Sequence, residues 1–247
     1  MKLQQLNKMA ARLAKRKAPP KYNKDNYIGV EIECLSPIDR ETFSLLIAPL
    51  SISKYINIGY DESIDTDTDY DGDRYGLEFR VCAKDKDIYQ VVKDLLEVMG
   101  TVDCEVNSSC GLHVHLDARN KDPKVMFARL LHNQDTLYSV TYNRAFNDFC
   151  VPLNPYKYNG SISDACAMSD HYTAINASAY NKYKTIEVRM MNGTLNVYVI
   201  NNWIKMLLCI VNNKPMTKTL IEFIKDRTFS YGKWSAKKHF ANTNKTA

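Results

Sequence analysis

The sequence lacks paired cysteines, a leader segment and any long apolar run. Its 247 residues include seven cysteines, an odd number, which are scattered and never spaced as Cys-x-x-Cys. This distribution excludes a disulfide framework and a zinc knuckle and favours reduced thiols. The N-terminus has no apolar signal core, and no hydrophobic stretch is long enough to span a bilayer. We therefore expect a soluble cytoplasmic protein without a membrane span.

The chain also has little excess charge, few histidines and no internal repeat. Thirty-three Lys and Arg residues face 28 Asp and Glu residues, and much of the surplus falls in residues 1–24. The remainder is close to neutral, which argues against a nucleic-acid partner. Only five histidines occur, yet two of them, His113 and His115, lie two positions apart.

The order of the expected elements mixes strands and helices without strict alternation. This order predicts an α+β fold with an antiparallel sheet and helices packed on one face. Gly100 is expected to cap the third helix. Alternating patterns predict strands over 27–34, 51–60, 76–82, 101–106, 112–116, 172–177 and 185–191, and helical spacing predicts helices over 2–17, 39–50, 87–99, 123–149, 197–211 and 216–224.

Three segments are expected in the domain organisation. We expect residues 1–24 to form a basic N-terminal helix or arm, residues 25–228 a single domain, and residues 229–247 a polar C-terminal tail. The arm has an apolar stripe surrounded by Lys and Arg and ends before Pro19 and Pro20. Such a helix is typical either of an element docked on the protein or a partner, or of an arm that binds a nucleic acid or a membrane surface.

Four expected strands share an unusual pattern, in which two ionisable residues two positions apart alternate with aliphatic residues. Each pair lies on one face of its strand, because successive side chains point to opposite faces. One such strand is typical of a half-exposed sheet, but glutamate is depleted in strands, so four are difficult to attribute to solvent exposure alone. The pairs are Glu31 and Glu33, Glu78 and Arg80, His113 and His115, and Glu187 and Arg189.

If these strands form one sheet, carboxylates, imidazoles and guanidiniums gather on one of its faces. Clustered carboxylates repel one another unless a cation joins them, and oxygen-rich ligand sets suit Mg²⁺ or Mn²⁺. A zinc hydrolase is a poorer fit, because only His132, His171 and His239 remain as further histidine ligands.

Arginines beside such a site indicate an anionic substrate, since a guanidinium binds phosphate or carboxylate through two hydrogen bonds. Arg144 either adds to this site or is an exposed arginine stabilised at the end of a helix.

Three short motifs, in this order, resemble the amidoligase family. They are Gly-Val-Glu-Ile-Glu at 29–33, the run from Asn107 to His115, and Thr-Ile-Glu-Val-Arg at 185–189 followed by Asn-Gly-Thr-Leu-Asn at 192–196. The resemblance extends over about residues 27–211. The family belongs to the carboxylate–amine ligases, which share the catalytic fold of glutamine synthetase, and this implies a curved, mostly antiparallel sheet.

The resemblance implies an ATP-dependent ligase that activates a carboxylate as an acyl phosphate, which an amine then attacks to give an amide. Its implied cofactors are ATP and Mg²⁺ or Mn²⁺, and its partners are a carboxylate and an amine substrate. The implied metal ligands are Glu31, Glu33, Glu78, His113 and Glu187. The implied catalytic residues are Glu33, Glu187 and Arg189, and the implied residues near the ATP phosphates are His115 and Arg189. The residue pattern adds Arg80 and Arg144 as candidates for phosphate binding. The residues expected in the substrate loops are Asn107, Ser108, Ser109 and Asp61.

The sequence departs from the family at His171-Tyr172, where an Arg-Tyr pair is usual, so one anion contact differs. Small members of the family are frequent in phage genomes, which implies a host cytoplasm if this chain is phage-encoded. Two alternatives stay open: a non-catalytic binding protein that keeps the ligase fold and uses its N-terminal helix as the partner contact, and a metal-dependent hydrolase.

Overall fold

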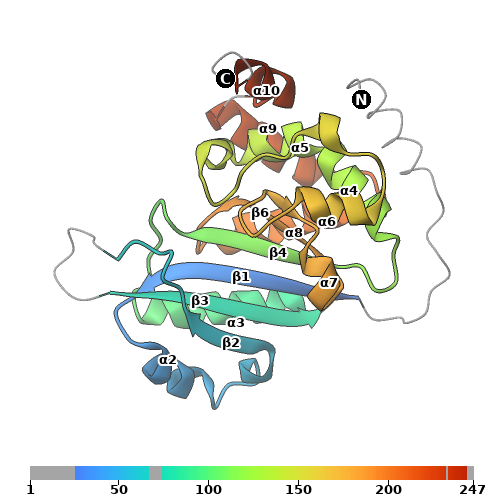
Figure 1. The fold of residues 1–247 in the computed structure, drawn as a ribbon. Helices are drawn as coiled ribbons and strands as arrows, with labels where there is room; N and C mark the ends of the chain where they lie inside the picture. The colour runs from blue at the N-terminus through green and yellow to red at the C-terminus, as the bar shows by residue number, and fades with distance from the viewer. Residues whose placement is uncertain (1–25, 67–73, 232, 244–247) are drawn as a thin grey trace. The chain divides into compact units, whose positions relative to one another are not determined.

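The computed structural model describes residues 26–66, 74–231 and 233–243. The fold is α+β, with a six-stranded sheet in the order β2-β3-β1-β4-β6-β5 (Figure 1). The pairs β1–β3, β2–β3 and β5–β6 are antiparallel. The described chain divides into two compact units: unit 1 comprises residues 116–190 and 202–243, and unit 2 comprises residues 26–115 and 191–201. The expected helix over 2–17 lies outside the described residues.

The central pair of unit 2 consists of β1 (Tyr27–Ser36) and β3 (Tyr75–Lys84). Their register places Glu33 opposite Glu78 and Glu31 opposite Arg80, so these four side chains share one face. Strand β2 (Ile56–Tyr60) pairs with β3, and β4 (Gly111–Asp117) begins in this unit.

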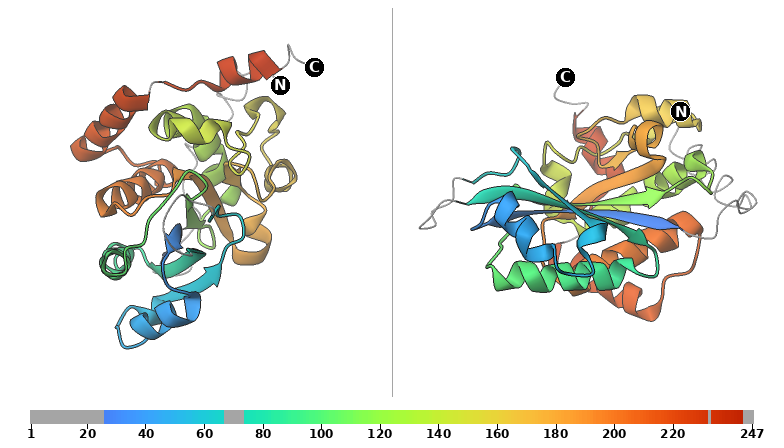
Figure 2. Two further views of the ribbon diagram at one scale, coloured as in Figure 1. Left: turned by 90° about the vertical axis from the view of Figure 1, so that its left-hand side faces the viewer. Right: turned by 90° about the horizontal axis from the view of Figure 1, so that it is seen from below.

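The opposite face of β1 and β3 is apolar and covered by helices. Helix α3 (Ile88–Thr101) lies against the sheet and contacts β3 (Figure 2). It buries a row of apolar side chains. Helix α2 (Arg40–Ile47), capped by Asp39, places Phe43 edge-on against Phe79 at a ring distance of 4.7 Å. The apolar face therefore forms the core of unit 2, and the alternation in β1 and β3 places the ionisable side chains on the other face. The row buried by α3 is Ile88, Val91, Val92, Leu95 and Met99.

Unit 1 is mainly helical. It contains α4 (Pro123–His132), α5 (Gln134–Val140), α6 (Ile162–Met168), α7 (Ala179–Tyr183), α9 (Lys218–Tyr231) and α10 (Ala236–Thr243). It also holds β5 (Ile175–Asn176) and most of β6 (Thr185–Asn192), and α8 (Val197–Asn212) lies mostly within it. Tyr138 is fully buried and packs on Trp234 at a ring distance of 4.6 Å.

Several element predictions are confirmed, and five are wrong in whole or in part. The long helix expected over 123–149 is three shorter segments, because the backbone leaves helical geometry at Asn133 and Thr141. The strand expected over 101–106 is a single bridge between Leu35 and Glu105, and that over 172–177 is only β5. Helix α3 continues through Gly100, so this glycine is not its cap.

The strand expected over 51–60 begins only at Ile56, after the 3₁₀ turn η1 (Ser53–Tyr55). Helix α10 forms within the polar tail predicted for 229–247. The predicted domain boundaries stay predictions. In the described residues, no helix is both long and apolar enough to cross a membrane.

Candidate functional site

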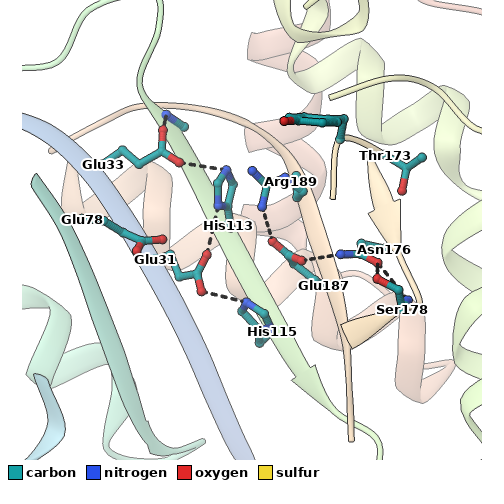
Figure 3. Close-up of polar contacts among 12 residues, drawn as sticks. Glu31, Glu33, Glu78, His113, His115, Thr173, Asn176, Ser178, Glu187 and Arg189 are labelled. Atoms are coloured by element: carbon teal, nitrogen blue, oxygen red, sulfur yellow. Dashed lines mark hydrogen bonds and ion pairs between the residues drawn. The ribbon is translucent and has the colours of Figure 1, made fainter. Parts of the chain in front are cut away.

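Five side chains of unit 2 make a carboxylate–histidine cluster: Glu31, Glu33, Glu78, His113 and His115. They come from the ionisable faces of β1, β3 and β4, and the two histidines point toward the glutamates of β1 (Figure 3). Glu33, Glu78 and His113 are almost fully buried. The alternative that the alternating residues form an ordinary solvent-facing strand surface is therefore wrong for these three. Buried carboxylates are rare in proteins unless a partner compensates their charge.

His113 lies between the two glutamates of β1. Its Nδ1 is 3.1 Å from Oε2 of Glu31, and its Nε2 is 3.2 Å from Oε1 of Glu33. The Nδ1 contact with Glu31 is a hydrogen bond, whereas the Nε2 contact with Glu33 is an ion-pair distance without hydrogen-bond geometry. A cation shared by these side chains would allow both carboxylates to remain charged.

The second histidine completes the arrangement around Glu31. The Nε2 atom of His115 lies 3.0 Å from Oε1 of Glu31. Burial raises the pKa of the Glu31 carboxyl, but the hydrogen bonds with His113 and His115 outweigh that effect, so the pKa lies well below its ordinary value. Glu31 is thus an anion at neutral pH.

The pKa of Glu78 is shifted in the opposite direction from that of Glu31. Burial and the negative charge of Glu31 raise the pKa of Glu78 to about 8, although its ion pair with Arg80 acts in the other direction. At neutral pH this carboxyl therefore holds a proton for most of the time, chiefly because burial disfavours its charged form and secondly because Glu31 is negative.

Three glycines fit around the cluster, a feature that the residue pattern alone did not reveal. The amide of Gly111 donates to Oε2 of Glu33 at 2.5 Å, and this bond orients that carboxylate. A Cβ atom on Gly29 would lie 3.0 Å from the Cβ of His115, and one on Gly59 would lie 3.1 Å from Arg80 Nη1. Both glycines therefore leave space for the neighbouring ionisable side chain.

The predicted substrate loops are held by local hydrogen bonds. The side-chain Oδ1 of Asn107 accepts from the backbone amide of Ser109 at 3.0 Å, and its side-chain Nδ2 donates to the backbone carbonyl of Asp65 at 2.7 Å. Ser108 is exposed, whereas the Asp61 carboxylate accepts from the amide and hydroxyl of Ser63. The two turns are thus tied together, and Ser108 is the loop residue most open to a ligand.

Glu187 and Arg189 form a buried ion pair on β6 in unit 1. Arg189 Nη1 lies 2.6 Å from Oε1 of Glu187, and the Asn176 amide donates to Oε2 of Glu187 at 2.9 Å (Figure 3). The carbonyl of Asn176 in turn accepts from the backbone amide and hydroxyl of Ser178. Asn176 was not predicted as a site residue, because its only signal is its position on the short strand β5.

The other predicted anion contacts differ in exposure. Arg80 is half exposed, and Arg144 is buried in the 3₁₀ turn η2 (Tyr142–Phe146), so Arg144 is not the exposed arginine of a helix end. The ring of His171 lies edge-on to that of Tyr172, and both residues are exposed. The prediction that residues of unit 1 and unit 2 serve one centre stays a prediction.

No protein-family model matches this chain, and no curated protein matches its sequence.

Proposed function

We propose that this chain is an ATP-dependent ligase that joins a carboxylate to an amine through an acyl phosphate, on a sheet of the glutamine synthetase type. The observation that carries the proposal is the carboxylate–histidine cluster, in which Glu33, Glu78 and His113 are buried together on one face of a sheet. The three ordered motifs that resemble the amidoligase family support the assignment of the reaction.

The cluster fits a divalent cation. Three carboxylates and one imidazole are ligands that Mg²⁺ or Mn²⁺ accepts, and Glu31 and His113 each offer a ligand atom. The raised pKa of Glu78 is consistent with this fit, because a cation would compensate both the burial of the carboxylate and its repulsion by Glu31. Glu31, Glu33, Glu78 and His113 would hold the ion, with Glu187 as the further ligand that the resemblance implies. A bound ion would offset the charge of the ATP phosphates and orient them for attack.

The reaction has two displacement steps. A carboxylate oxygen of the substrate attacks the γ-phosphorus of ATP, and ADP leaves. The amine nitrogen then attacks the acyl carbon, loses a proton and expels phosphate. In this scheme His115, Arg80 and Arg189 bind phosphate oxygens, because guanidiniums and imidazoliums stabilise the charge that moves between the reactants.

Phosphate release tests the proposal. The purified chain is incubated with ATP, Mg²⁺ and pools of amino acids and peptides, and inorganic phosphate and new amide masses are measured together. We expect both to appear only when ATP, Mg²⁺ and a carboxylate–amine pair are present. Glu33→Gln should lower turnover by about 100-fold or more with little change in melting temperature. Arg189→Ala should lower turnover as much and should also lower the melting temperature, because it leaves the buried Glu187 carboxylate without its ion-pair partner.

Arg40→Met is the matched control, because Arg40 is an exposed arginine whose partner Glu41 is also exposed. Absence of ATP consumption with every pool would contradict the proposal. A large loss of melting temperature in Glu33→Gln would instead identify a structural ion network, and metal-dependent cleavage without nucleotide would identify a hydrolase.

A further inference from the structure

Unit 1 buries the guanidinium of Arg144, which forms no ion pair with any residue that the structure describes. Arg144 lies in η2 and is 2% exposed. Its Nε and Nη1 atoms are buried and have no hydrogen-bond partner among the described residues. Within the same part of the chain, no carboxylate lies within ion-pair distance of it. A buried guanidinium without partners is costly, because it loses its hydration and gains nothing in return.

The Cys150 thiol and the Tyr138 hydroxyl, whose pKa values are lowered by the charge of Arg144, stay neutral at neutral pH. Burial raises the pKa of the Cys150 thiol to about 11, even though Tyr138, Arg144 and Arg189 lower it. Burial also raises the pKa of Tyr138 well above its ordinary value, and the Tyr138 hydroxyl donates to the carbonyl of Cys150 at 2.6 Å. Neither group supplies a negative charge to Arg144 at neutral pH.

The neighbouring carboxylate is already engaged. Glu187, whose charge also acts on Cys150, is bound by Arg189 at 2.6 Å and by Asn176 at 2.9 Å. Of the charged side chains that act on Cys150, two are guanidiniums and one is a carboxylate, and that carboxylate is held by Arg189. Among these groups the charge of Arg144 is in excess, and an arginine does not relieve such an excess by losing a proton.

We propose that Arg144 is the centre of a buried oxyanion-binding site in unit 1, filled by a phosphate or carboxylate group of a ligand. A guanidinium offers its N–H donors in a planar fork that matches either oxyanion. The bound group would balance the excess charge and give the unpartnered nitrogens their acceptors. This site does not depend on the ligase proposal, since an anion would bind at Arg144 whether or not the chain forms amides.

Anion-dependent melting of the full chain tests the site. Wild type, Arg144→Met, Arg144→Lys and the exposed control Arg40→Met are melted in sodium chloride, inorganic phosphate, acetate or ATP without metal, all at equal ionic strength. We expect phosphate, ATP or acetate to raise the melting temperature of wild type and Arg40→Met above the chloride value. Arg144→Met should weaken the binding of the stabilising anion by about tenfold or more. Arg144→Lys should retain part of the binding, because the lysine keeps the positive charge.

The outcomes separate an anion site from a purely structural arginine. A response to phosphate and ATP identifies a phosphate group as the natural occupant, and a response to acetate identifies a carboxylate. In chloride, Arg144→Met should be no less stable than wild type, because the variant removes an uncompensated charge. Equal anion responses in wild type and Arg144→Met would overturn the proposal, as would a large destabilisation of Arg144→Met in chloride. Loss of ligase activity alone would not bear on this result.

Discussion

At the scale of single residues, Glu78 is the group whose charge depends most on what the cluster holds. Its pKa is raised to about 8 by burial and by Glu31, compared with 4.5 as its ordinary value. Between these two pH values the folded chain holds a proton that the unfolded chain has released. The contribution of Glu78 to stability is therefore full below about pH 4.5 and is lost as the pH rises through about 8.

Glu78→Gln should remove this pH dependence from the metal-free protein. With a chelator present, the melting temperature of the variant relative to wild type should rise between pH 5 and pH 9, because only wild type must bury a charged carboxylate at high pH. Glu97→Gln on α3 is the control, since Glu97 is 66% exposed. A difference between Glu78→Gln and wild type that stays constant over this range would contradict the shifted pKa.

The ionisable pairs could be identified from sequence, but their surroundings could not. Alternation along a strand determines which side chains share a face, and β1 and β3 confirm it for Glu31 and Glu33. It does not determine whether that face is covered, so the burial of Glu33 was not predictable. The bonds from Gly111 to Glu33 and from Asn176 to Glu187 join residues distant in sequence, and no local pattern indicates them.

At the scale of elements, the turn after β6 is fixed by one close approach. The amide of Gly193 donates to the carbonyl of Cys110 at 2.8 Å, and a Cβ atom at this position would lie 2.5 Å from that of Cys110. Because Cys110 directly precedes β4, this contact secures the start of the strand that carries both histidines. Only glycine fits this position without displacing the backbone of Cys110.

Two glycine substitutions should change stability in opposite directions. Gly193→Ala should lower the free energy of unfolding by about 1–3 kcal/mol through overpacking against Cys110. Gly100→Ala should raise it by about 0.5–1 kcal/mol, because Gly100 lies in helix α3 and a Cβ there meets no atom within 4 Å. Urea unfolding measures both, and equal effects of the two variants would contradict this account of Gly193.

The element predictions that failed depend on interactions beyond the local pattern. Residues 123–149 keep helical spacing, yet α4 ends at Asn133, whose backbone is not helical. The side-chain amide of Asn133 donates to the backbone carbonyl of Arg129. Residues 101–106 have strand-like composition but meet β1 only through the bridge from Glu105 to Leu35. A strand needs a partner along its length, and the sequence of one segment does not supply that information.

At the scale of the whole molecule, the proposed ligase uses residues of both compact units. Glu31, Glu33, Glu78 and His113 belong to unit 2, and Glu187 and Arg189 belong to unit 1. If these residues serve one metal centre, Glu187→Gln should weaken Mn²⁺ binding as Glu31→Gln does, by about tenfold or more. The double variant should then lose less affinity than the sum of both effects, since the two ligands act on the same ion.

The most direct measurement is titration calorimetry of the full chain with Mn²⁺ and with ATP in the presence of Mg²⁺. The account predicts that wild type and Arg40→Met bind both, and that Glu31→Gln and Glu187→Gln bind the metal at least about tenfold more weakly. A scaffold that keeps only the fold would bind no nucleotide. Absence of binding heat for wild type with both titrants across a range of temperatures would contradict the central claim.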